Sequence, residues 1–151
     1  MYPFVLATHN LVRWLVLTAA IVAIAWAVVG WLKKKEWTKT GDLTGAIFVG
    51  LLDLNVLLGL ILYLFLSPIT TQVVFANFGA AMKDNMLRFF AVEHIFTMLV
   101  ALALAHVGRV LSKKASDAMK KHRAAVIWFT LSLLAIVVMI PWNRPLLPGL
   151  G

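Results

Sequence analysis

The sequence contains no cysteine and few charged residues. Without a thiol the chain has no disulfide scaffold, thiolate metal site, cysteine nucleophile, iron–sulfur cluster or covalent c-type haem attachment. Charged residues make up 13% of the 151 positions, whereas globular proteins carry about 25%. The sequence also lacks a Walker loop, a dinucleotide fingerprint, an HExxH motif and a nucleophile elbow. The enzyme classes that depend on those motifs are therefore excluded.

Hydrophobic residues, by contrast, are abundant. They make up 62% of the chain, and the mean hydropathy is +0.93. A soluble domain of this size buries only about 70% of the surface that its unfolded chain exposes, so it cannot hide this much apolar surface. A chain this apolar does not remain disordered in water either. The composition therefore predicts an integral membrane protein that lies in a lipid bilayer.

Four long apolar runs predict four membrane-spanning helices. Each run has an uninterrupted part of about 19–24 residues, which at about 1.5 Å per residue matches a hydrocarbon core of roughly 30 Å. Helices are expected because the backbone of such a segment must satisfy its own hydrogen bonds in lipid. We expect an all-α, up-down four-helix bundle in a single domain, 1–151. The predicted spans are about 5–32, 43–66, 88–108 and 123–142, with an outer loop at 67–87.

The positive charges predict the orientation of the four spans. Ten of the fourteen basic residues lie in the connections that follow the first and third spans. Such loops remain cytoplasmic, so both termini are expected on the periplasmic side of a bacterial inner membrane. The basic cluster Lys33–Lys35 follows the first apolar run, which is also too long for a signal peptide, so this run is read as a retained span. The net charge of +8 is thereby explained without a nucleic-acid partner.

Ionisable side chains within the spans need a separate explanation. Each costs on the order of 2.5–3.5 kcal/mol at the centre of a membrane helix, so each is a candidate functional residue. They belong to the first three spans. The candidates are His9, Arg13, Asp53, Glu93, His94 and His106, together with Arg88 at the mouth of the third span and the amide of Asn55.

His9 and His94 form the most specific pattern among these residues. Both lie near the outer ends of spans that run in the same direction and can face each other diagonally across a bundle. Two imidazoles from different helices are a usual axial ligand set for a b-type haem. Arg13 shares the face of His9, and Arg88 and Lys83 at the outer rim are expected near the haem propionates. Small residues below both histidines leave room for a flat cofactor or, alternatively, allow close helix packing.

The depth of the two histidines is ambiguous. Counted from the outer side, they lie at similar depths. Counted from the cytoplasmic side, Lys33 to His9 spans about 36 Å, whereas Arg109 to His94 spans about 22 Å. The two counts agree only if the first span protrudes from the membrane or tilts strongly.

The remaining candidates have both structural and functional interpretations. Arg13 is expected either to form a buried ion pair with Glu93 or Asp53, or to leave these carboxylates to relay protons at a quinol site. A second haem between His106 and His122 is a further hypothesis. The competing interpretation of His122 is a solvated residue at the membrane interface, because it lies in the polar run KKHR.

Five stretches spread over nearly the whole chain form a recognisable pattern. They are HNLVRWLVL (9–17), DLNVLLGLILY (53–63), RFFAVEH (88–94), IWFT (127–130) and PW (141–142). The pattern resembles that of short, four-span bacterial membrane proteins labelled as b-type cytochromes. The resemblance implies a four-span topology and supports His9 and His94 as cofactor-binding residues. In some members a histidine stands in the place of Asp53 and a glutamine in that of Asn55. A cofactor ligand that such a histidine would supply from the second span of those proteins is thus missing from this chain.

These observations favour a small redox-associated membrane protein. We expect it to bind haem b, exchange electrons with a membrane quinone, and lie within or beside a larger respiratory or photosynthetic complex, without being an independent enzyme. The alternative is a cofactor-free accessory subunit that stabilises a larger assembly through its alanine-lined faces and the apolar segment 70–82. A third hypothesis places a chlorin pigment on the same histidines, which an absorption spectrum would distinguish from haem.

Overall fold

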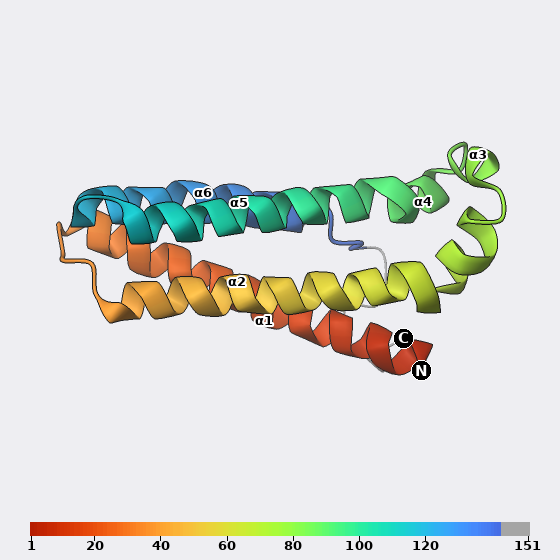
Figure 1. Ribbon diagram of the computed structural model, residues 1–151, viewed down its shortest axis with the longest axis horizontal. Coiled ribbons are helices and arrows are strands. Elements are labelled where there is room, and N and C mark those ends of the chain that lie inside the picture. Colours follow the sequence, from red (N-terminus) through yellow and green to blue (C-terminus); the bar gives the residue numbers. More distant parts are fainter. Residues whose placement is uncertain (143–151) are drawn as a thin grey trace.

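A computed structural model of the chain describes residues 1–142 and shows an all-helical protein (Figure 1). Four long helices account for most of these residues. The predicted domain 1–151 also includes residues 143–151, which lie outside the described part. The long helices are α1 (Tyr2–Leu32), α2 (Lys39–Ile61), α5 (His94–Lys114) and α6 (Ala118–Val138).

Short π-helical and α-helical segments extend two of the long helices. The segment η1 (Leu62–Leu66) continues α2, while α4 (Asn85–Arg88) and η3 (Phe89–Glu93) lead into α5. The four resulting units are all long and apolar enough to cross a membrane: Tyr2–Leu32, Lys39–Leu66, Asn85–Lys114 and Ala118–Val138. The prediction of four long apolar helices is thus confirmed. The helices begin before each predicted span, and α6 ends four residues before position 142.

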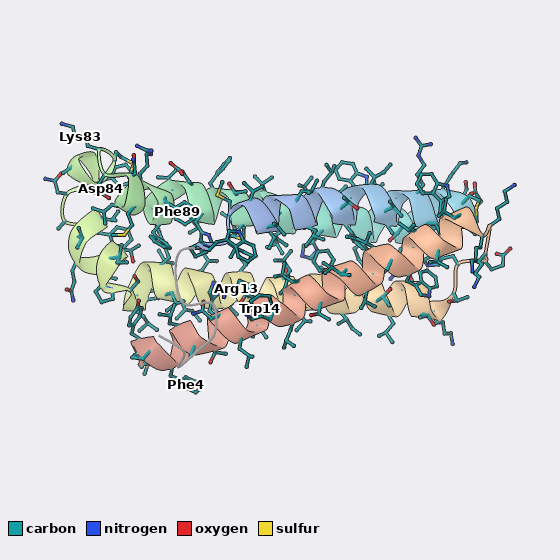
Figure 2. The ribbon with its side chains drawn as sticks, turned by 180° about the vertical axis from the view of Figure 1, so that it is seen from behind. Phe4, Arg13, Trp14, Lys83, Asp84 and Phe89 are labelled. Carbon is teal, nitrogen blue, oxygen red and sulfur yellow. The ribbon has the colours of Figure 1, made fainter. Side chains whose placement is uncertain are left out.

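The predicted outer loop contains helical structure of its own. We call residues 67–84 the end cap; it contains η2 (Ile69–Val74) and α3 (Phe78–Ala81). Val74 and Ala81 are buried against Ala91 of η3, while Phe75 and Phe78 are exposed. The apolar side chains of the end cap therefore divide between a small core within this chain and its surface. Figure 2 labels Lys83 and Asp84, the last two residues of the end cap, at one end of the bundle.

The four long helices form a bundle in which consecutive long helices run antiparallel (Figure 1). Helix α1 packs against α2 and α6, and α5 packs against the same two helices. Helices α1 and α5 therefore lie diagonally opposite each other, as expected for the spans that carry His9 and His94. Helix α1 is also inclined to α2 (Figure 1). This tilt is one of the two conditions under which the depths of the two histidines agree.

Small side chains allow the helices to approach closely in the middle of the bundle. Ala20 and Ala23 of α1, and Ala101 and Ala105 of α5, are at most 2% exposed and belong to one apolar core. Two aromatic rings from α2 and α6 are also part of this core. The small faces predicted below the histidines are thus used for helix packing, which was the alternative to holding a flat cofactor.

The end of the bundle opposite the end cap holds a buried histidine. His122 of α6 is fully buried, and its ring packs against Trp26 and Trp37 at centroid distances of 5.2 and 5.0 Å. Its Nε2 donates a hydrogen bond to the carbonyl of Lys35 (3.1 Å). The interpretation of His122 as a solvated residue is wrong. The ring fits because Gly30 has no side chain, and a Cβ at that position would overlap the imidazole.

The centre of the core generates a prediction about stability. Phe129 is 1% exposed and packs edge to face against Phe48, with ring centroids 5.3 Å apart. We expect Phe129→Ala to lower the free energy of unfolding by about 3–5 kcal/mol, because the cavity left behind cannot collapse fully. Phe4→Ala is the matched control, since Phe4 is 76% exposed on the outer side of α1 (Figure 2). Thermal unfolding of both variants in one detergent tests this, and equal midpoints would contradict it.

Candidate functional site

A cavity of about 500 Å³ lies inside the bundle near the end cap. Ligand sites in proteins span roughly 300–1,000 Å³, so this volume suits a cofactor or a substrate-sized molecule. The four long helical units all contribute to its wall. Its lining includes Tyr2, His9, Asn10, Arg13, Val16, Leu52, Asn55, Gly59, Tyr63, Thr70, Phe90, His94, Met98, Ile136 and Ile140.

His9 is held by the backbone of α2. Its Nδ1 lies 3.1 Å from the carbonyl oxygen of Asn55. A carbonyl oxygen only accepts, so Nδ1 donates the proton, and the neutral ring then carries its lone pair on Nε2. Gly59 follows Asn55 by one turn on the same face, and a Cβ there would lie 3.2 Å from Cε1 of His9. The absence of a side chain at Gly59 thus gives the imidazole access to the carbonyl.

His94 is held in the same way by the end of α6. Its Nδ1 donates a hydrogen bond to the carbonyl of Met139 (2.8 Å), the residue that follows the last residue of α6. The last carbonyl groups of a helix have no partner within the helix, so His94 satisfies one of them. The rings of Phe89 and Phe90 pack beside the imidazole, with centroids 5.7 and 6.4 Å from it. The neutral ring of His94 therefore also carries its lone pair on Nε2.

The structure brings three of the predicted cofactor-binding residues together. His9, Arg13 and His94 line the same cavity. Within residues 1–142, neither Nε2 of these two histidines has a hydrogen-bond partner. Two imidazoles from diagonally opposite helices thus have an available nitrogen at one cavity. The count from the outer side, which gave similar depths, agrees with this arrangement.

Arg13 supplies the charge of the cavity wall. Its side chain is 6% exposed, its Nη1 donates to Oδ1 of Asn10 (3.5 Å), and its guanidinium lies 5.8 Å from the ring centroid of Trp14. Figure 2 labels Arg13 and Trp14 on α1. Among the described residues that line the cavity, Arg13 is the only one with a permanent charge. The site therefore suits a largely apolar molecule with an anionic group.

Asn55 adds an unsatisfied acceptor to the wall. The residue is 8% exposed, and within the described residues its buried Oδ1 has no hydrogen-bond partner. A buried polar atom without a partner costs free energy, so such an atom at a cavity indicates a group that a ligand or a water molecule satisfies.

Sequence reasoning missed Tyr63 and Thr70 as parts of the site. The Tyr63 hydroxyl donates to the carbonyl of Ala91 (2.9 Å), and the Thr70 hydroxyl donates to the carbonyl of Tyr63 (2.6 Å). Ala91 lies in η3 and Tyr63 in η1, so these bonds join the two π-helical segments to each other and to the end cap. The only sequence signal was the position of both polar groups beside the predicted end of the second span.

Arg88 and Glu93 lie outside the cavity wall and pair with each other. Nε of Arg88 lies 2.8 Å from Oε1 of Glu93, and its other donors contact the carbonyl of Met82 and Oδ1 of Asn85. Arg88 was expected near the cavity as a partner for propionates. In the structure its three donor nitrogens instead bind groups of η3, α4 and the end cap, because these segments adjoin Arg88 in the chain.

Asp53 also lies outside the cavity wall. Its Oδ1 accepts a hydrogen bond from Nε2 of His106 (2.9 Å), between α2 and α5. The expected ion pair of Arg13 with Glu93 or Asp53 is therefore replaced by pairs with Arg88 and His106. The structure does not bring His106 and His122 together, since His122 is enclosed by tryptophans of α1 and the following connection. The proton-relay role of Glu93 and Asp53 stays a prediction.

The described residues place two imidazoles, those of His9 and His94, at the cavity. Within residues 1–142 no group of three or more histidine and carboxylate side chains is arranged to hold a bare metal ion. A haem needs fewer protein ligands, because the porphyrin supplies four nitrogens and the protein supplies the two axial positions. The donor set therefore fits a haem iron better than a free ion.

Comparisons with protein-family models, with curated proteins and with solved structures found no match to this chain. The function must therefore be inferred from the cavity itself. Its main features are two oriented imidazoles, a buried guanidinium and an amide oxygen that no described residue satisfies, in an apolar surrounding.

The role of Asn55 can be separated from the stability of the fold. We expect Asn55→Leu to unfold at the same temperature as the wild type or higher, because the substitution removes an unsatisfied buried amide and keeps the carbonyl that binds His9. Ser132→Ala is the comparison, since the buried Ser132 hydroxyl donates to the carbonyl of Ala101 (2.7 Å). We expect this loss to cost about 1 kcal/mol. Thermal unfolding tests both variants, and strong destabilisation by Asn55→Leu would show that the amide serves the fold.

Proposed function

We propose that this four-span membrane protein is a small electron-transfer protein that holds a b-type haem between His9 and His94. The observation that carries the proposal is the matched orientation of the two rings. Each ring donates from Nδ1 to a backbone carbonyl, and each has an Nε2 at one cavity that no other described residue binds. A hydrogen bond on the far nitrogen fixes the tautomer and orientation of a metal-ligating histidine, which is the arrangement seen here.

The other residues of the wall fit the periphery of the same group. A porphyrin is flat and mainly apolar, as are the surrounding side chains such as Val16, Leu52 and Met98. Arg13 is positioned to bind a propionate, because a buried guanidinium forms strong, charge-assisted hydrogen bonds to carboxylates. When bound, the haem iron would supply one-electron redox chemistry. His9 and His94 would hold the iron through Nε2, and the apolar side chains of the wall would keep water away from the ring.

The architecture supports a partner within the membrane. The connections between α1 and α2 and between α5 and α6 are short, so apart from the end cap little of the described chain lies outside the four helical units. We therefore propose that electrons pass to and from a membrane quinone, within or beside a larger complex of a bacterial inner membrane. Both termini are proposed to face the periplasm, because the basic connections lie at the opposite end of the bundle.

The cofactor-free accessory role is the second candidate. It depended on alanine-lined faces that bind other subunits, but the structure buries these alanines inside this chain. The exposed aromatic residues Phe75 and Phe78 on the end cap remain as support for it. The same spectroscopic experiment distinguishes the two candidates.

The haem hypothesis predicts a b-type spectrum that depends on His94. The purified protein should bind haemin in a ratio of one to one. Its dithionite-reduced minus air-oxidised difference spectrum should show a Soret shift and an α-band. We expect His94→Ala to weaken haemin binding at least tenfold and to abolish the spectrum of two axial imidazoles. His106→Ala is the control, because His106 lies outside the cavity. A colourless wild type that does not titrate with haemin would refute the proposal and favour the accessory role, and a chlorin spectrum would identify a pigment instead.

A substitution that leaves both ligands in place tests the geometry. We expect Gly59→Val to displace the imidazole of His9, because even a Cβ at this position lies 3.2 Å from Cε1. The variant should bind haemin several-fold more weakly and lose part of the bis-histidine spectrum. Gly50→Val on the same helix is the matched control, since a Cβ at Gly50 meets nothing within 4 Å. Equal haemin titrations for the two variants would show that the position of His9 is not critical.

A further inference from the structure

The Asp53–His106 pair lies on the lipid-facing surface of the bundle. Oδ1 of Asp53 lies 2.9 Å from Nε2 of His106, and the two side chains are 47% and 50% exposed. Asp53 follows Lys39 by 14 residues and precedes Leu66 by 13, and these residues bound the second candidate span. At about 1.5 Å per residue, both ends of the span are roughly 20 Å away. Asp53 is therefore at the middle of its span, whereas His106 lies eight residues before Lys114, where the third candidate span ends.

This location is unfavourable for a chain that faces only lipid. Ionisable groups within a membrane almost always face the interior of the protein or a water-filled cavity, because hydrocarbon cannot satisfy their polar atoms. Among the described residues, the other carboxylate oxygen of Asp53 and Nδ1 of His106 have no hydrogen-bond partner. Elsewhere on the surface of the bundle, α1 and α6 expose apolar residues such as Val22 and Ile127. Among the described residues, the surface formed by α2 and α5 thus carries polar atoms that still require a partner.

The same surface allows a close approach. We call the exposed strip of α2 and α5 around Asp53 and His106 the α2–α5 face. Ala46 and Gly50 precede Asp53 at helical spacing and are exposed, and a Cβ at Gly50 would meet nothing within 4 Å. Ala103 is exposed one turn before His106 on α5. Small residues at such spacing let helix backbones come together in a membrane, where polar side chains then form hydrogen bonds between the helices.

The charges of the α2–α5 face select its partner. One helix supplies an acid and its neighbour supplies a base, so the face is complementary to a copy of itself. Copies inserted in the same orientation are related by a twofold axis along the membrane normal, which keeps every residue at its own depth. That axis places α2 opposite the partner's α5, so Asp53 faces His106 of the partner subunit. We propose that the protein forms a homodimer through the α2–α5 face, in which two carboxylates and two imidazoles share one hydrogen-bonded cluster.

The test is energy transfer between labelled copies in lipid vesicles. The chain has no cysteine, so Ser116→Cys in the connection between α5 and α6 gives a single site for a donor or acceptor dye. We expect transfer that rises and saturates as the protein-to-lipid ratio increases. Gly50→Leu should lower the apparent association constant at least tenfold, because its side chain separates the two faces. Val22→Leu, on the opposite surface, should leave the constant unchanged.

An exchange of the two polar residues tests the pairing itself. Asp53→His and His106→Asp should each weaken self-association, because each variant presents two like groups to its copy. A mixture of the two variants, one labelled with donor and the other with acceptor, should restore transfer, because each now faces the complementary pair. Unchanged helicity and monodispersity of both variants show that they are folded.

The result that overturns the proposal is equally definite. Purified wild type that stays monomeric at every protein-to-lipid ratio would show that lipid or a different protein covers the α2–α5 face. Transfer that is insensitive to Gly50→Leu would place the dimer contact elsewhere. If the mixed variants fail to restore energy transfer, Asp53 does not pair with His106 of the partner subunit. None of these outcomes depends on a bound haem, so the dimer and the haem site are tested separately.

Discussion

The main constraint on this protein is that a polar group in a membrane must find its partner within the protein. Three histidines meet this constraint in the same way, because each donates one ring nitrogen to a backbone carbonyl. His9 uses the carbonyl of Asn55, His94 that of Met139 and His122 that of Lys35. Each bond links two helices or a helix and a connection, and each fixes which nitrogen keeps the lone pair. The fold thereby determines the tautomers on which any ligand chemistry depends.

The same bond has different consequences at the two ends of the bundle. Near the end cap, the lone pairs of His9 and His94 meet a cavity, whereas at the other end two tryptophans enclose His122 completely. Two glycines make these arrangements possible, since Gly59 and Gly30 each provide the space that a ring occupies. Between the two ends the alanines and the rings of Phe48 and Phe129 fill the core. The half of the bundle away from the end cap is therefore filled by packed side chains, and the half near the end cap contains the cavity.

Hydrophobicity and helical spacing were sufficient to predict the four long helices and to group His9, Arg13 and His94. Those predictions depend on local properties: apolar length, charge at the ends of runs, and residues four apart on one face. The environment of His122 was not predictable, because the polar run around it gives no sign of Trp26, Trp37 and Gly30, which come from elsewhere in the chain. The prediction of ion-pair partners failed for a similar reason. Glu93 pairs with Arg88, five residues earlier in the chain, and Asp53 pairs with a residue of another helix.

The π-helical turns of η1 and η3 have a consequence for the evolution of this protein. A π-turn accommodates one extra residue in a helix and often marks a functional site. Each added residue rotates everything beyond it by about 100° around the helix axis. All residues on one side of a position lost from η3 would therefore point in new directions relative to those on the other side, and His94 directly follows η3. A single-codon deletion there would keep the hydrophobic length of the helix almost unchanged, yet it would turn the imidazole away from His9.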